Sequence, residues 1–234
     1  MPDKGVLYLL PTPLGHNELS DVIPEGVLRI VPLLTHFFVE ELRSGRRFLS
    51  AAGHRGKIES LKLYELNEHT KDSELGDFIK VLEDGNDAGL LSEAGIPAVA
   101  DPGSSLVSLA HKRGIRVIPM SGPSSIILAL AGSGMNGQSF HFHGYLPVKT
   151  DERRGAIKRI EAVSLSTEVS QIFIETPYRN NSVLSDIIDV CNSRTRLCIA
   201  ANITLEDSFI VTKTIAEWKN ERPDLNKKPC VFIL

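Results

Sequence analysis

Short apolar runs alternate with amphipathic stretches along the first half of the chain, a pattern that predicts α/β architecture. The expected strands are Val6–Pro11, Thr35–Val39, Lys62–Leu66, Asp87–Ser92 and Arg116–Pro119. The helices between them are expected at Asp21–Val31, Arg43–Ala52, Asp72–Glu83 and Ser104–Arg113. The third helix has clear ends, because Asp72-Ser73-Glu74 is typical of a helix start and Asp84-Gly85 of a stop.

A second pattern begins near Gly122. The expected elements there are a helix of small residues in PSSIILALAGSG, a strand at Ser139–Gly144, a charged helix at Asp151–Val163, a strand at Gln171–Glu175 and a helix from about Tyr178 to Val190. Antiparallel strands are expected at Leu197–Ile203, Ser208–Thr214 and Cys230–Leu234, with a short helix around Trp218. This change predicts two α/β domains, residues 1–118 and 119–234, of which the second has a mixed sheet.

The composition is that of an ordinary soluble protein. Among 234 residues, 42% are hydrophobic and 24% are charged, and the net charge of −3 gives no strong bias toward nucleic acid or membrane. No apolar run approaches the roughly 18 residues that span a bilayer. Cys191, Cys198 and Cys230 show no CxxC spacing, which indicates neither a zinc site nor a disulfide framework. We therefore expect a cytoplasmic protein that needs no metal and does not act at a membrane.

Three loops rich in Pro and Gly follow predicted strands. They are PTPLG (11–15), SEAGIPAVADPG (92–103) and PMSGPSS (119–125). Ligands of open α/β sheets bind beyond the carboxyl ends of the strands, so these loops are candidates for the walls of a pocket. Any one of them is also compatible with an ordinary tight turn.

The chemistry of these loops disfavours a nucleotide triphosphate. The Walker pattern GxxxxGK[ST] is absent, since Gly56-Lys57-Ile58 fails both its spacing and its hydroxyl. The loops contain no Lys or Arg, whereas the second contains Glu93 and Asp101, which would repel phosphates. A neutral adenosine that carries a sulfonium cation would tolerate these carboxylates. By exclusion, the loops point to S-adenosylmethionine.

Two other patterns have competing interpretations. Residues 132–137 match GxGxxG, but the match ends a predicted helix and precedes a strand, so we interpret it as a helix C-cap and connector rather than a dinucleotide site. His141 and His143 lie on one face of a predicted strand, a geometry that a metal could use. No third ligand is near in sequence, and alternating polar residues on a half-buried strand are common, which favours a structural role.

Basic residues gather in two segments. The first cluster is Arg43, Arg46, Arg47, Arg55 and Lys57, and the second is Lys149, Arg153, Arg154, Lys158 and Arg159. A run of charges is often just a solvated face. If both clusters line one cleft, they would suit the phosphate backbone of a nucleic acid.

The ordered set of motifs resembles a known family. The segments LYLLPTPLG, SEAGIPAVADPG, PMSGPSS, FHGYLPVKTDERR and IETPYR occur in this order over nearly the whole chain. Together they resemble the tetrapyrrole-methylase superfamily, and within it the ribosomal small-subunit RNA methyltransferase I group. The resemblance implies two α/β domains with S-adenosylmethionine in the interdomain cleft, and a homodimer. It also implies methylation of a ribose 2′-hydroxyl of small-subunit ribosomal RNA, not of DNA.

The resemblance also implies site residues by position. The cofactor-binding positions would be Leu14, Gly15, Ser92, Glu93, Ala94, Gly95, Ile96, Val99, Ser125, Ile126 and Ile174. Polar positions facing the cleft would include Glu40, Arg43, Glu175 and Arg179, and of these Glu40 and Arg43 are the catalytic candidates. A ribose hydroxyl must lose a proton during methyl transfer, so a carboxylate can serve as general base. Glu40 is the first candidate for this base and Glu93 the second, although either carboxylate is also suited to pairing with a nearby arginine.

The sequence departs from the family pattern at several points. Gly15-His16-Asn17-Glu18 stands where Gly-Asn-Leu is typical, and Val39-Glu40-Glu41-Leu42-Arg43 stands where Ala-Glu-Asp-Thr-Arg is typical. Glu93 replaces an Asp, and Ala201-Asn202 replaces a charged pair. These departures leave two alternatives open: a methyltransferase for a small tetrapyrrole-like molecule, and a cofactor-binding paralogue without catalysis.

Overall fold

Five parallel strands form the sheet of the first unit, residues 1–124, in a computed structural model that describes residues 4–15 and 18–234. The strands are β1 (Val6–Leu9), β2 (His36–Val39), β3 (Lys62–Glu65), β4 (Ala88–Leu91) and β5 (Arg116–Pro119), in the order β3-β2-β4-β1-β5. All four residues of β4 are buried, because this strand pairs with β1 on one side and β2 on the other. The five predicted strands are therefore confirmed.

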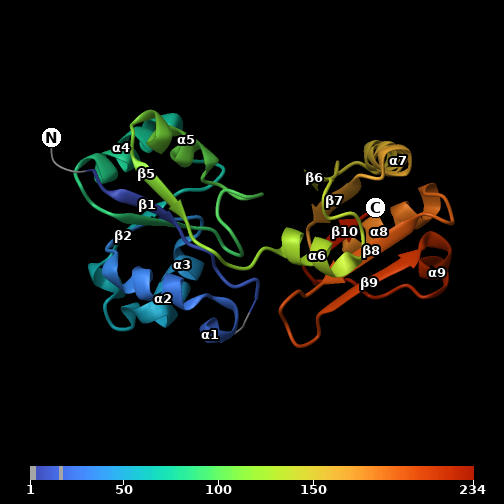
Figure 1. The fold of residues 1–234 in the computed structure, drawn as a ribbon, viewed down its shortest axis with the longest axis horizontal. Helices are drawn as coiled ribbons and strands as arrows, with labels where there is room; N and C mark the ends of the chain where they lie inside the picture. Colours follow the sequence, from blue (N-terminus) through green and yellow to red (C-terminus); the bar gives the residue numbers. More distant parts are fainter. Residues whose placement is uncertain (1–3, 16–17) are drawn as a thin grey trace. The chain divides into compact units, whose positions relative to one another are not determined.

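Helices cover both faces of this sheet (Figure 1). One face packs against α4 (Asp72–Glu83) and α5 (Ser104–Lys112). The other packs against α1 (Leu19–Val22), α2 (Glu25–Ile30) and α3 (Leu42–Leu49), together with short turns at Val31–Leu33, Ser50–His54 and Ile58–Ser60. Phe37 and Phe38 of β2 are fully buried on opposite faces, as expected for a strand of a parallel sheet covered on both sides.

One predicted helix of this unit is wrong in extent. A single helix was expected at Asp21–Val31, but α1 ends at Val22, α2 begins at Glu25, and the 3₁₀ turn from Val31 follows. Ile23 and Pro24 between them are extended. A proline disfavours the helical conformation of the residue before it, which accounts for the break.

The second unit, residues 125–234, has a mixed sheet in the order β6-β7-β10-β8-β9. Its strands are β6 (Phe140–Tyr145), β7 (Ser170–Glu175), β8 (Arg196–Ala201), β9 (Phe209–Thr214) and β10 (Cys230–Ile233). Only the β6–β7 pair is parallel in this sheet, and the other three pairings are antiparallel. The predicted mixed sheet is confirmed.

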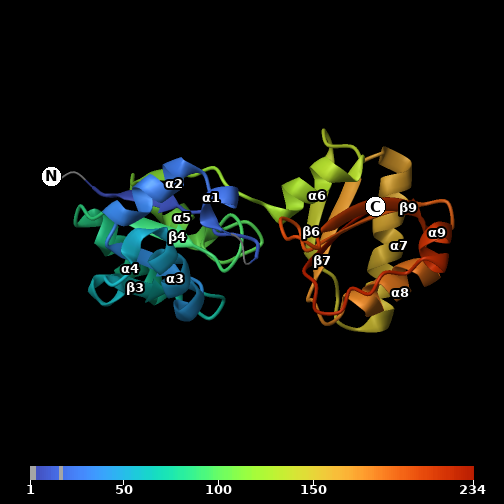
Figure 2. The same cartoon turned by 90° about the horizontal axis from the view of Figure 1, so that it is seen from below.

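The helices of this unit also lie on both faces of its sheet (Figure 2). One face packs against α7 (Thr150–Thr167), α8 (Asn180–Val190) and α9 (Ile215–Asn220), with Trp218 buried among them. The other packs against α6 (Ser125–Ser133) through Ile126, Ala129 and Leu130. α6 ends at Ser133, inside the GxGxxG match, so the match does not open a helix after a strand.

The units divide between Ser124 and Ser125, six residues after the boundary expected at 118/119. Two contacts explain why 119–124 stays with the first unit. The Met120 N–H donates to the Leu9 carbonyl (3.0 Å), which continues the pairing of β5 with β1. Gly122 lies so close to Pro11 that a Cβ at this position would be 2.2 Å from Pro11 Cγ.

Candidate functional site

Three loops meet at the carboxyl edge of the first sheet. Thr12 and Gly95 exchange two backbone hydrogen bonds of 2.9 and 3.0 Å, which join the loop after β1 to the loop after β4. A Cβ on Gly95 would lie 3.3 Å from Leu14 Cδ2 and 3.6 Å from the Pro123 carbonyl oxygen. Leu14, Gly95 and Pro123 thus bring all three loops to one point.

The loop after β4 is held in an unusual backbone conformation. Gly95 and Gly103 have φ of 86° and 129°, and Ala98 and Ala100 have φ of 64° and 65°. The left-handed region costs a residue with a Cβ about 1–2 kcal/mol. Such outliers persist only where the surroundings fix them, and they are frequent in ligand-binding loops.

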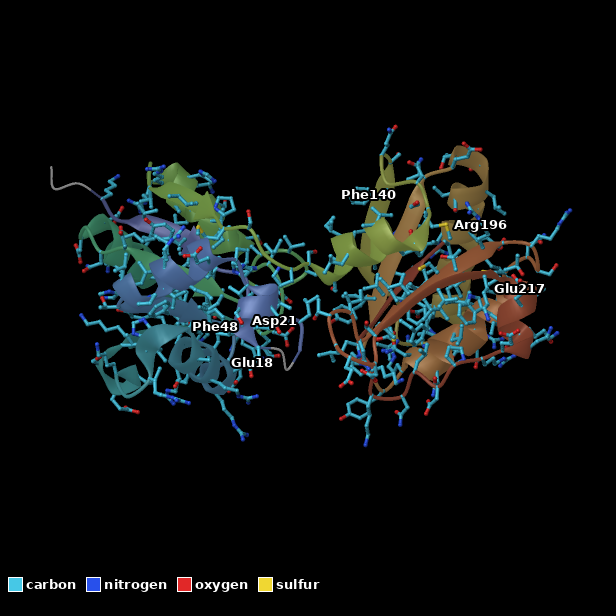
Figure 3. The ribbon with its side chains drawn as sticks, turned by 60° about the horizontal axis from the view of Figure 1, so that its bottom comes forward. Glu18, Asp21, Phe48, Phe140, Arg196 and Glu217 are labelled. Atoms are coloured by element: carbon cyan, nitrogen blue, oxygen red, sulfur yellow. The ribbon has the colours of Figure 1, made fainter. Side chains whose placement is uncertain are left out.

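A cavity of about 420 Å³ opens beside these loops, within the first unit. Five of the expected cofactor residues line it: Leu14, Gly15, Ser92, Glu93 and Ala94. Its opposite wall comes from α3, which contributes Ser44, Arg47 and Phe48. Figure 3 shows Phe48 of α3 and Glu18, which precedes α1; both line the cavity. Arg47 and Phe48 were not predicted as site residues, because only the packing of α3 against the sheet turns them toward the loops.

Three carboxylates gather at the same edge. Glu40 follows β2, and its Oε2 accepts the Glu93 N–H at 3.0 Å. Burial raises the pKa of Glu40, the hydrogen bond from the Glu93 backbone partly opposes this, and the charges of Glu93 and Glu68 add to the rise. Burial also raises the pKa of Asp101 from 3.8 to about 6, with a further contribution from Glu40. The edge therefore concentrates negative charge, and a bound cation would relieve it.

Glu40 and Arg43, the two catalytic candidates, differ in their surroundings. Glu40 is half-buried next to the loop after β4, whereas Arg43 is exposed on α3, and neither residue lines the cavity. Between them, Glu41 caps α3 by accepting the N–H groups of Arg43 and Ser44 at 2.8 and 2.6 Å. These bonds lower the pKa of Glu41. Among the described residues Glu40 thus forms no ion pair with an arginine, and its carboxylate contacts the loop backbone instead.

The remaining expected cofactor residues lie elsewhere. Ile96 and Val99 continue the loop after β4, outside the cavity lining, and Val99 is exposed. Ser125 and Ile126 begin α6 in the second unit. Ile174 of β7 packs against the apolar cluster that contains Ile126. The two residues therefore lie on the same side of the second sheet, the side that α6 covers.

Glu175 and Arg179 form an ion pair in the second unit. The buried Glu175 carboxylate accepts the Thr176 N–H at 2.7 Å and lies 2.6 Å from Arg179 Nη2. Arg179 also donates to the Pro147 carbonyl at 3.4 Å. The pair therefore fixes the turn that links β7 to α8.

The departures from the family pattern have different structural settings. His16 and Asn17 lie outside the described residues. Ala201 ends β8 and is fully buried in the core. Asn202 has a left-handed φ of 50° and donates to Asp207 Oδ2 at 2.8 Å. The uncharged pair Ala201-Asn202 therefore serves packing and a turn.

The histidine pair of β6 has a local structural role. The rings of His141 and His143 stack with centroids 4.2 Å apart, and His143 Nε2 lies 2.7 Å from Gln171 Oε1. Among residues 4–15 and 18–234, no group of three or more His, Cys, Asp or Glu side chains is placed to hold a metal ion.

The second basic cluster does not form a free cationic surface. The buried Arg153 donates through Nε to Asp186 Oδ2 at 2.7 Å. Arg154 pairs with Asp186 and Asp189 at 2.7 and 2.8 Å, and Lys149 pairs with Glu152 at 3.2 Å. Carboxylates of α8 therefore neutralise the two central arginines of this cluster, which leaves it less suited to phosphates than five free cations would be.

Comparisons with known proteins agree over nearly the whole chain. Residues 22–219 match the family model of Tetrapyrrole (Corrin/Porphyrin) Methylases. A relative from Vibrio cholerae named Ribosomal RNA small subunit methyltransferase I is 30% identical over 237 residues, covering 98% of this chain and 76% of its own. The relative of the same name from Pseudomonas aeruginosa is 33% identical over 235 residues, covering 98% and 78%.

A solved structure shares the fold. The crystal structure of the methyltransferase CobJ matches this chain with a TM-score of 0.64 at 14% identity, covering 98% of this chain and 93% of its own. Within the described residues, no helix combines the length and apolar character needed to cross a membrane.

Proposed function

The chain belongs to the tetrapyrrole methylase family and is a methyltransferase, and from this premise we propose that it methylates a ribose 2′-hydroxyl of small-subunit ribosomal RNA with S-adenosylmethionine as donor. The observation that carries the proposal is the extent of the likeness to relatives named for this ribosomal substrate, which covers 98% of the chain. The choice of ribosomal RNA as the substrate rests on the names of these relatives. The sulfonium donor is supported by the chemistry of the loops.

The residues at the sheet edge fit such a donor. The loops at 11–15, 92–103 and 119–124 contain no Lys or Arg. Glu40, Glu93 and Asp101 supply negative charge close to one another, which suits a sulfonium and an ammonium cation and disfavours phosphate. Leu14, Gly15, Ser92, Glu93, Ala94, Gly95, Ile96 and Val99 would hold the donor from the first unit, and Ser125, Ile126 and Ile174 from the second. When bound, the donor supplies a methyl group already activated by its positive sulfur.

The protein's own task is then to orient the ribose and accept its proton. Holding the hydroxyl in line with the methyl group lowers the activation barrier of the transfer, by up to about 7–11 kcal/mol at the favourable limit. Glu40 is suited to accept the proton because its raised pKa lies closer to neutrality than that of an ordinary carboxyl. Its hydrogen bond to the Glu93 N–H fixes its orientation. Glu93, which lines the cavity, is the second candidate.

The small-molecule alternative would be favoured by an apolar cavity poor in acids. Much of the cavity lining is apolar, but it also contains Glu18, Glu93 and Arg47, so the cavity is not poor in acids. We therefore place a tetrapyrrole-like acceptor second, and a paralogue without catalysis third. The proposal includes a homodimer, as the family resemblance implies, and a cytoplasmic location, where ribosomal RNA would be the substrate and the three free cysteines would stay reduced.

A methyl-transfer assay tests the proposal. The purified protein is incubated with S-adenosylmethionine labelled in its methyl group and with small-subunit ribosomal RNA or particles that lack the modification, and the RNA is digested to nucleosides. We expect label in a 2′-O-methylnucleoside with the wild type and much less with Glu40→Gln. Label in a base, or no label with either substrate form, would contradict the proposal. A control variant, Glu59→Gln, changes an exposed carboxylate away from the cavity and should retain activity.

A further inference from the structure

The first basic cluster stays unpaired, in contrast to the second. Arg43, Arg46 and Arg47 lie on α3, and Arg55 and Lys57 follow shortly after; all five are exposed. In the described part of the chain, none of the five forms an ion pair within 4.0 Å. The nearby Glu41 carboxylate accepts the N–H groups at the start of α3. We call these five residues the α3 cationic face.

Helix stability accounts for only part of the charge of this face. Arg46 and Arg47 lie in the last turn of α3, where the helix dipole favours cations, but Arg43 lies in the first turn, where a cation is disfavoured. Arg55 and Lys57 lie beyond the helix. Arg43 and Arg47 are four residues apart and Arg43 and Arg46 are three apart, so their side chains are neighbours on one helix surface. Like charges at this spacing repel one another and destabilise a helix. The chain as a whole carries a net charge of −3, so the cluster does not reflect a generally basic composition. Bound anions would relieve the repulsion among these neighbouring cations.

The face is attached to a fixed scaffold. A Cβ on Gly45 would lie 3.0 Å from Val39 Cγ1, so α3 packs closely on β2, and Phe48 and Leu49 are buried beneath it. Beyond α3, Gly53 has φ of 120°, and the buried His54 Nε2 lies 2.9 Å from the Val31 carbonyl oxygen. These contacts hold the backbone that carries Arg55 and Lys57. The backbone positions of these cations are therefore fixed by packing and hydrogen bonds.

The face reaches the cavity of the candidate site. Arg47 belongs both to the α3 cationic face and to the cavity lining, which also contains Ser92 and Glu93 of the loop after β4. A polyanion bound along α3 would therefore pass the rim of this cavity. The loops on the far wall carry no cation, so the positive charge lies on the α3 side only.

We propose that the α3 cationic face binds the phosphate backbone of the RNA next to the nucleotide that is methylated. This inference rests on the proposed function and assigns its RNA contact to one surface. Several separated cations match a repeating anion such as a phosphodiester chain better than a single phosphate. Arg47 contacts the phosphate nearest the acceptor, while Arg46, Arg55 and Lys57 contact phosphates farther along the strand.

The test compares two triple variants with equal loss of charge. The first, Arg46→Gln/Arg55→Gln/Lys57→Gln, removes three cations of the face and leaves the catalytic candidates and the cavity lining intact. The control, Lys158→Gln/Arg159→Gln/Arg194→Gln, removes three exposed cations of the second unit that form no ion pair among the described residues. Binding of small-subunit ribosomal RNA is measured by filter retention over a range of salt concentrations. Binding of S-adenosylmethionine is measured in parallel by calorimetry.

We expect the first variant to bind RNA about 10- to 100-fold more weakly than the wild type. The slope of log affinity against log salt should fall by about 2–3, because each lost phosphate contact removes about 0.7–0.9 from it. Its affinity for S-adenosylmethionine should be unchanged, which shows that the fold is intact. The control should keep the wild-type slope. If the triple variant fails to fold, the single variants Arg46→Gln and Arg55→Gln should each lower the slope by about 0.7–0.9.

Three results would overturn the inference: an unchanged slope in the first variant, an equal loss in the control, or a wild type that does not retain RNA. A failure of the proposed function can be distinguished from a failure of this inference. A wild type that binds RNA through this face and transfers no methyl group would contradict the proposed function alone.

Discussion

Asp101 offers a direct test of the negative charge gathered at the sheet edge, because its surroundings destabilise the ionised form of its carboxyl group. Burial and the neighbouring Glu40 and Glu93 raise its pKa from 3.8 to about 6. A shift of about two units corresponds to about 3 kcal/mol. Asp101 is partly exposed, so solvent screening reduces this to about 1 kcal/mol. Asp101→Asn should therefore stabilise the protein by about 1 kcal/mol wherever the wild-type carboxyl is ionised.

The sign of the pH dependence follows from the raised pKa. The folded state holds this proton more tightly than the unfolded state, so protonated Asp101 favours folding below about pH 4. This contribution is lost as the pH rises through about 6. The variant should consequently match the wild type near pH 4 and exceed it near pH 8. For a chain of this size, 1 kcal/mol raises Tm by about 2–4 °C.

Thermal unfolding followed by circular dichroism at several pH values measures this difference. Glu59→Gln is the matched control, since it neutralises an exposed carboxylate and should change the stability by less than about 0.5 kcal/mol. An Asp101→Asn variant less stable than the wild type at pH 8 would refute the reasoning. So would a gain in stability that is equal at pH 4 and pH 8.

Three further substitutions test the fold and the site. Gly89→Ala should destabilise the first unit by about 1–3 kcal/mol, because the new Cβ would lie 2.5 Å from Leu10 Cδ1 and 2.8 Å from Phe37 Cδ1. Denaturant unfolding measures this loss, and an unchanged unfolding midpoint would contradict the close packing at Gly89. Asp186→Asn should cost about 3–5 kcal/mol, since it leaves the buried Arg153 without its counter-charge, and Asp189→Asn on the exposed side of α8 should cost far less. Glu40→Gln should lower kcat by about 10²–10⁴ while leaving donor affinity within a few-fold, and an unchanged kcat would remove Glu40 as general base.

The strand pattern and the domain count were predictable because they depend on local periodicity. The buried run Ala88–Leu91 already indicated a central strand, and all five strands of the first sheet lie where they were expected. The break at Pro24 was also encoded locally, but the apolar periodicity on both sides masked it. The convergence of the three loops followed from the general position of loops at the ends of parallel strands.

The electrostatic features depended on residues distant in sequence. Arg153 and Arg154 look as free in sequence as Arg46 and Arg47, and only the position of Asp186 on α8, more than thirty residues away, distinguishes the clusters. The raised pKa of Asp101 likewise depends on burial by the fold and, to a smaller degree, on Glu40, which follows a different strand. Arg47 and Phe48 become site residues only through the rotation of α3 on the sheet. No pattern along the chain reports these contacts.

The central claim is that the three cation-free loops of the first sheet bind S-adenosylmethionine. Calorimetric titration of the purified protein with S-adenosylmethionine, and with ATP as the control, tests it most directly. We predict micromolar binding of S-adenosylmethionine and none of ATP, because the loops themselves contain carboxylates and no Lys or Arg. Binding of ATP in place of S-adenosylmethionine, or no binding of S-adenosylmethionine by the folded protein with RNA present or absent, would contradict the account.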